Sequence, residues 1–77
     1  PEGCILTLKN KDVPGVVGRV GTILGKEDIN IAEYILSRPH LNEDPISIIK
    51  IDQSLNQKTL EKLASNIEIV ELKQFKV

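Results

Sequence analysis

The chain has 77 residues, with 10 Lys and Arg against 11 Asp and Glu, a formal net charge of -1 and one cysteine. That length holds one domain with a modest core, and one cysteine excludes an intrachain disulfide or a metal cage built from this chain's cysteines alone. The mixed charge argues against a nucleic-acid partner, which usually requires a basic stripe. No apolar run approaches the ~20 residues of a membrane span, so we expect no membrane partner either.

The organisation of the chain points to a piece of a larger molecule. It begins at Pro1 and contains no Met, so we expect residues 1–77 to form a single domain of a longer protein. The residues present include no secretory or transit signal, and we expect a cytoplasmic location. A core this small is marginal alone, which makes a second copy or a parent protein the expected source of further stability.

The first half of the chain predicts a strand, a turn and a helix. Residues 4–9 place apolar side chains at alternate positions, as a β-strand does. Residues 10–15, NKDVPG, contain the Asp, Pro and Gly that are typical of a turn. Residues 16–24 carry valines, isoleucine and leucine at helical spacing, and residues 25–28 are expected to end that helix.

The second half predicts two strands, a helix and a last strand. Ser54 and Gln57 have the spacing of a capping box, which predicts Ser54 as the N-cap of the second helix. Leu60, Leu63 and Ala64 then mark the apolar side of that helix. The remaining ranges are a strand over 29–38, a connection over 39–45, a strand over 46–52 and a strand over 67–77.

This βαββαβ order predicts an α+β, ferredoxin-like fold: a four-stranded antiparallel sheet with two helices on one face. The strand over 29–38 is apolar on both sides, because Ile31 and Ile35 alternate with Tyr34 and Leu36. A strand with one wet face would alternate more cleanly. We therefore expect a homodimer through sheet edges, with 29–38 as an exposed edge; scattered surface apolar residues are the alternative.

Glycines recur along the first helix. Their spacing is G-x-x-G-x-x-G-x-x-x-G, which differs from the dinucleotide fingerprint G-x-G-x-x-G. We expect no cofactor in this domain. Gly18, Gly21 and Gly25 share one helix face, and each costs ~1 kcal/mol relative to alanine. That cost predicts close packing of the sheet or of a second helix against this face.

The turn before the first helix is the candidate ligand site. Pro14 suits the first turn of a helix, and Gly15 leaves the N–H groups around Val16 uncovered. Such groups attract a carboxylate, while Asp12 can accept hydrogen bonds from an ammonium group. The turn therefore suits a zwitterion such as an α-amino acid. The alternative is that Asp12 only caps the helix.

Other polar residues carry weaker predictions. Asn30, just before the second strand, can both donate and accept hydrogen bonds, although a turn asparagine is the commoner role. His40 has no acid or nucleophile arranged around it in the sequence. Cys4 fits a small core hydrophobe. We therefore expect no catalytic residues and no metal site in this domain.

The stretch NKDVPGVVGRVGTILGKEDINIAEYILSR, followed by ISIIKIDQSL and LEKLASNIEIVELKQFKV, resembles an ACT domain. It is most similar to the C-terminal ACT domains of D-3-phosphoglycerate dehydrogenases, whose parent enzymes use NAD in serine biosynthesis. The resemblance implies an allosteric site for L-serine between two domains joined edge to edge. It implies Asn10 and Asp12 as ligands from one subunit and Asn30 from the other.

Several alternatives stay open at this point. Some family members carry His or Tyr where Asn10 stands and Asn where Asp12 stands, which leaves the effector's identity open. A similar ACT domain occurs in iron–sulfur L-serine dehydratases, and a ligand-free dimerisation module has the same fold. An RNA-recognition domain is disfavoured because the strand over 46–52 has no aromatic residue. A small enzyme of the acylphosphatase kind would need a nucleophile–base pair that the sequence does not show.

Overall fold

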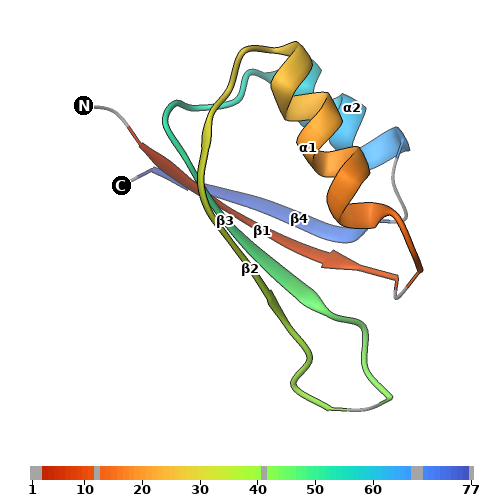
Figure 1. Ribbon diagram of the computed structural model, residues 1–77. Coiled ribbons are helices and arrows are strands. Elements are labelled where there is room, and N and C mark those ends of the chain that lie inside the picture. The colour runs from red at the N-terminus through yellow and green to blue at the C-terminus, as the bar shows by residue number, and fades with distance from the viewer. Residues whose placement is uncertain (1–2, 12, 41, 67–68, 77) are drawn as a thin grey trace.

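The computed structural model describes residues 3–11, 13–40, 42–66 and 69–76. Six elements follow one another as βαββαβ, and both helices lie on the same side of one sheet (Figure 1). The predicted α+β, ferredoxin-like fold is confirmed. The elements are β1 Cys4–Asn10, α1 Val16–Lys26, β2 Ile31–Ser37, β3 Ile46–Ile51, α2 Gln57–Asn66 and β4 Ile69–Lys76.

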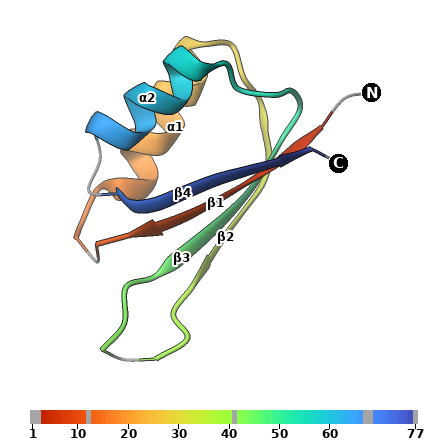
Figure 2. The same ribbon diagram turned by 180° about the vertical axis from the view of Figure 1, so that it is seen from behind.

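The sheet has the strand order β2-β3-β1-β4, and every neighbouring pair is antiparallel. Figure 2, the view from behind, also shows both helices on one side of the sheet and no helix on the other. The order places β2 and β4 at the two edges, and the prediction that the second strand is an edge strand is confirmed. The unpaired N–H and C=O groups of an edge strand are a template for pairing with another chain.

The core lies between the sheet and the two helices. β1 alternates strictly, with every second side chain buried, because successive strand residues point to opposite faces. The helix α1 buries one stripe, and α2 covers the end of the core nearer β4 (Figure 2). The buried hydrophobic residues are Cys4, Leu6, Leu8, Val16, Val20, Leu24, Ile29, Ile49, Ile51, Leu55 and Leu63.

The opposite face of the sheet also carries apolar side chains. Ile35 pairs with Ile48, and Ile5 pairs with Phe75, on the side that the helices leave uncovered. Ile35 is 46% exposed, Ile48 39% and Phe75 51%. The apolar character on both faces that the sequence indicated is therefore present in the fold.

The start of α2 differs from the sequence prediction. The helix begins at Gln57, and Asn56 Oδ1 accepts a hydrogen bond of 2.8 Å from the Thr59 N–H. Asn56 is thus the N-cap, and the predicted capping box on Ser54 is wrong. Ser54 lies two residues too early for that role, and its Oγ accepts a 3.2 Å hydrogen bond from the Cys4 thiol instead.

An ionic contact joins the end of α1 to α2. Glu27 accepts hydrogen bonds from Lys62 Nζ at 3.3 Å and from Thr59 Oγ1 at 3.2 Å. The hydrogen bond and the positive charge of Lys62, followed by the hydrogen bond from Thr59, hold the pKa of the Glu27 carboxyl below its ordinary value. The ionised form of Glu27 therefore favours the folded state at neutral pH.

The glycine face of α1 lies open to its surroundings. A Cβ added at Gly18, Gly21 or Gly25 would meet no atom of the described residues within 4 Å. Gly18 and Gly25 are exposed, and Gly21 is half-buried. The prediction that the sheet or α2 packs closely there is wrong for contacts within this chain.

Candidate functional site

The N-terminus of α1 is shaped by Gly15. This residue is the N-cap and adopts φ 89° and ψ -3°, the left-handed region that glycine tolerates best. Its carbonyl accepts the first helical hydrogen bond from the Arg19 N–H at 3.0 Å. A glycine has no side chain to cap the first turn, so the first N–H groups of α1 are directed toward the space before the helix. Asp12 lies outside the described residues, so neither of its two predicted roles is tested.

A hollow of about 330 Å³ lies between this helix end and the C-terminal end of β2. Three of the predicted site residues, Asn10, Gly15 and Val16, line it together, whereas Pro14 is exposed beside it and is not part of its lining. The other lining residues are Val13, Val17, Gly18, Leu36, Arg38 and Pro45.

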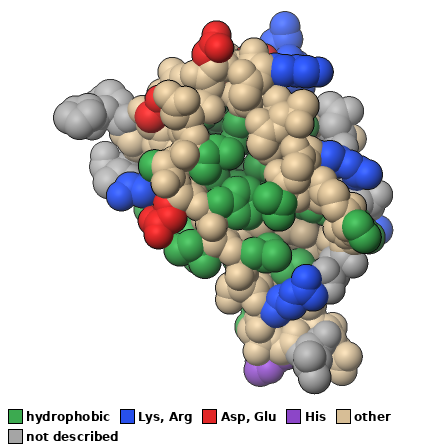
Figure 3. All heavy atoms as spheres, in the orientation of Figure 1, with side chains coloured by type: hydrophobic (Ala, Val, Ile, Leu, Met, Phe, Trp, Pro, Cys, Tyr) green, Lys and Arg blue, Asp and Glu red, His purple; other side chains and the backbone are tan. Residues whose placement is uncertain are grey.

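The lining of this hollow combines positive charge with apolar side chains, which suits a small negatively charged ligand. The guanidinium of Arg38 and the positive end of α1 supply the charge that a carboxylate needs. Val13, Val17 and Leu36 are 40%, 48% and 43% exposed. Figure 3 shows hydrophobic side chains gathered on the face between α1 and the sheet. Sequence reasoning missed Arg38, because it is the last residue of the predicted strand and only the fold brings it beside α1.

The side chain of Asn10 is buried and held by hydrogen bonds within the chain. Its side chain is 3% exposed, its Nδ2 donates to the Lys11 carbonyl at 3.0 Å, and its Oδ1 accepts from Ser47 Oγ at 3.3 Å. Ser47 Oγ in turn accepts from the Tyr34 hydroxyl at 3.1 Å. This chain of hydrogen bonds ties the turn to β3 and β2, so Asn10 shapes the wall of the hollow. The signal in the sequence was Ser47, a hydroxyl at an otherwise apolar position of β3.

Asn30 lies at the other end of β2. The register pairs Ile31 with Ile51 and Ser37 with Ile46, whereas the Asn10 N–H bonds to the carbonyl of Pro45. The length of β2 separates the two asparagines by roughly 20 Å along the strand. Within one chain, therefore, Asn30 does not join the other predicted site residues.

The local structure fixes Asn30 firmly. Asp28 adopts φ 58° just after α1, and the Ile29 N–H bonds back to the Leu24 carbonyl at 3.0 Å. This is the pattern of a helix C-terminal cap, and it turns the chain into β2. Asn30 then donates to the Asp52 carboxylate from both its backbone N–H, at 3.2 Å, and its side-chain Nδ2, at 3.1 Å. Sequence reasoning missed Asp52, which is 22 residues away.

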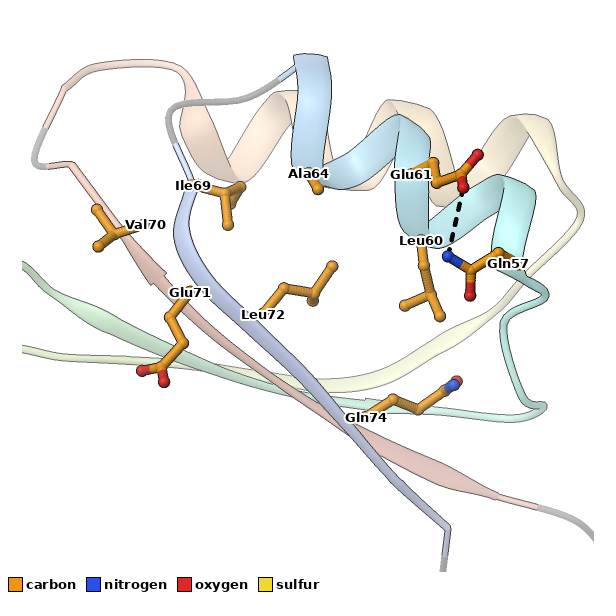
Figure 4. A pocket seen from close by; sticks show the side chains of 9 residues that line it. All are labelled: Gln57, Leu60, Glu61, Ala64, Ile69, Val70, Glu71, Leu72 and Gln74. Atoms are coloured by element: carbon orange, nitrogen blue, oxygen red, sulfur yellow. Dashed lines mark hydrogen bonds between the residues drawn. The ribbon is translucent and has the colours of Figure 1, made fainter.

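A second hollow, of about 390 Å³, lies between α2 and β4 (Figure 4). Its floor is apolar, with Leu60 and Leu72 pointing into it, and Gln57 donates to Glu61 at 3.4 Å along the α2 side of the hollow. Its charged lining residues are Glu61 and Glu71, and none of its described lining residues is Lys or Arg. Two carboxylates repel the carboxylate of an amino acid, so this hollow is the poorer candidate.

The described part of the chain shows few features of other functional classes. Within it, no three His, Cys, Asp or Glu side chains lie close enough together to hold a metal ion. Cys4 is buried, and His40 lies exposed, 3.9 Å from Glu43. Neither of the two described helices has the length and apolar character required to cross a bilayer.

Comparison with known proteins gives consistent results. The family model for the ACT domain matches residues 5–68. The chain is 36% identical over 73 residues to a D-3-phosphoglycerate dehydrogenase of Bacillus subtilis, covering 95% of this chain and 14% of that protein. It is 34% identical over 62 residues to D-3-phosphoglycerate dehydrogenase 2 of Arabidopsis thaliana, covering 80% and 10%.

Solved structures agree on the fold. The regulatory subunit of aspartate kinase from Thermus thermophilus superposes with a TM-score of 0.71 at 19% identity, covering 96% of this chain and 50% of that one. At that identity the similarity establishes the fold alone. The chain spans less than a sixth of the length of the two dehydrogenases that it matches.

Proposed function

Because the chain belongs to the ACT-domain family, we propose that it is an allosteric regulatory domain that binds a small L-amino acid, with L-serine as the favoured effector. Residues 1–77 would be one domain of a longer, cytoplasmic D-3-phosphoglycerate dehydrogenase of serine biosynthesis, and NAD would bind elsewhere in that enzyme. The matches to dehydrogenases of this kind support the parent. The observation that carries the ligand proposal is the hollow at the start of α1, next to an unpaired sheet edge.

The edge of the sheet supplies the geometry for a shared site. Two copies related by a two-fold axis would pair β2 antiparallel to β2 and form one eight-stranded sheet. In a register centred on Tyr34, the middle residue of β2, Asn30 of the partner subunit falls opposite Arg38. Such a pairing overcomes the separation between Asn30 and the hollow within one chain and forms two equivalent sites.

The charges of the site match those of an amino acid. The effector's carboxylate would lie near the N–H groups of Gly15 and Val16 and the guanidinium of Arg38. Its ammonium would face Asp12, and the partner's Asn30 would close the site. A helix end contributes ~0.3–1 kcal/mol to an exposed anion and up to ~2 when partly buried, whereas micromolar binding requires roughly 8 kcal/mol. The charge-assisted hydrogen bonds must therefore supply much of the affinity.

Calorimetric titration with L-serine tests this proposal. The wild-type dimer should bind one L-serine per chain, and Asn30→Ala should lower the affinity by about tenfold or more, because a charge-assisted bond is lost. Glu71→Gln is a control, since Glu71 is exposed on β4, at the edge of the sheet opposite β2. Absence of any heat of binding with L-serine and other small L-amino acids would refute the proposed function.

A further inference from the structure

Asp52 and Asn30 bind each other reciprocally at the end of the β2–β3 pair. The Asp52 N–H donates to the Asn30 carbonyl at 3.2 Å, while the two oxygens of the Asp52 carboxylate accept from the backbone and side chain of Asn30. Gln53 Nε2 also donates to the Asp28 carbonyl at 3.2 Å, which ties the segment after β3 to the segment after α1. The three hydrogen bonds between Asn30 and Asp52 thus fix the position of an exposed asparagine.

This arrangement determines which way the Asn30 amide faces. An ionised carboxylate can only accept hydrogen bonds, so only the NH2 group of the amide can be directed at Asp52. The amide oxygen of Asn30 is consequently turned away from Asp52. Asp52 follows β3, and β3 lies on the inner side of β2. The oxygen is therefore the part of the amide left to meet a donor other than Asp52, and β2 is the edge strand along which a partner subunit would lie.

We propose that Asp52 sets the polarity of the effector site by presenting Asn30 to the ligand as a hydrogen-bond acceptor next to a negative charge. This inference rests on the proposed function and deepens it. The end of the site formed by the partner's Asn30 takes a donor, the ammonium group of the effector. The end formed by Arg38 and the start of α1 takes the carboxylate. The site then selects α-amino acids over acids of the same size that lack the ammonium group.

The charge distribution along β2 supports this polarity. Arg38 follows one end of the strand, and Asp52 lies beside the other end. A two-fold axis beside the middle of β2 would place the Arg38 end of each β2 next to the Asp52 end of the partner's β2. The dimer would therefore contain two such pairs of opposite charges. A zwitterion placed between the two ends meets an opposite charge at each of its own groups, whereas a simple carboxylic acid meets only one.

The test compares L-serine with 3-hydroxypropanoate, which is serine without its ammonium group. Asp52→Asn keeps the size of the side chain, removes the charge and allows the Asn30 amide to turn over. It should lower the affinity for L-serine tenfold to a hundredfold and leave the weak binding of 3-hydroxypropanoate unchanged. The control Glu71→Gln removes one exposed negative charge on β4, at the edge of the sheet opposite β2, and should alter neither affinity.

Two outcomes would separate the role of Asp52 from the existence of the amino-acid site. If the wild type binds L-serine and Asp52→Asn keeps the same ratio of the two affinities, the role of Asp52 is refuted while the amino-acid site stands. If the wild type binds no amino acid, the proposed function fails, and the role of Asp52 fails with it. Should Asp52→Asn lower the melting temperature, Asp52→Ser gives the same comparison, because its hydroxyl can still accept the hydrogen bond from the Asn30 N–H.

Discussion

Replacing glycines on the outer face of α1 by alanine should stabilise this domain. Gly21 and Gly25 lie in the helix, and a Cβ at either position would meet no atom of residues 3–11, 13–40, 42–66 or 69–76 within 4 Å. Alanine is favoured over glycine in a helix interior by about 0.8–1 kcal/mol. The double variant should therefore gain about 1–2 kcal/mol, which corresponds to a rise in melting temperature on the order of 5–15 °C for a domain of this size.

Urea unfolding of the wild type and of the two single variants measures this gain as a change in the midpoint at constant slope. Gly15→Ala is the matched control. It also adds a methyl group to open space, but at φ 89°, a conformation that costs an alanine about 1–2 kcal/mol. The reasoning would be refuted if Gly21→Ala or Gly25→Ala lowered the free energy of unfolding as Gly15→Ala should.

Three further outcomes are expected. Asn56→Ala should lower the free energy of unfolding by about 1 kcal/mol in urea titrations, because the N-cap of α2 is lost; an unchanged midpoint would contradict the cap. Glu27→Gln should destabilise the domain above the ordinary glutamate pKa of about 4.3. Since the pKa of Glu27 is lowered in the fold, this difference should disappear as the pH falls through the folded-state pKa, as thermal melts across pH would show. Ile35→Asp should shift the dimer toward monomer in sedimentation, since it places a carboxylate opposite the partner's Glu33; an unaltered dimer would exclude β2 from the contact.

The fold could be predicted because its signals are local. Strict alternation in β1 and the apolar stripe of α1 each reflect which side chains face the core, and both can be counted along the chain. The cap of α2 was misassigned because Ser54 and Asn56 are both good caps, and only the position of the first helical turn decides between them. The prediction of close packing against the glycines of α1 was wrong within this chain, because a sequence shows which residues share a helix face but not what lies against that face.

The candidate site was predicted only in part, because its contacts cross the sheet. Asn10, Gly15 and Val16 are near one another in the chain, and their clustering followed from the turn. The bonds of Asn10 to Ser47 and of Asn30 to Asp52 depend on the pairing of β1 with β3 and of β2 with β3. A shift of one residue in either register would turn those side chains to the other face, and such a register cannot be counted from one strand alone.

A complementation experiment tests the shared amino-acid site most directly. Asp12→Ala and Asn30→Ala should each lower the affinity for L-serine by about tenfold or more at both sites of the homodimer, because every site would lack one of its two sides. After the two variants are mixed and allowed to exchange subunits, a mixed dimer contains one site with both substitutions and one site with neither. Calorimetry should then recover one L-serine per mixed dimer at the wild-type affinity. Failure to recover any binding at that affinity, although mixed dimers form, would contradict a site built from the turn of one chain and the asparagine of its partner.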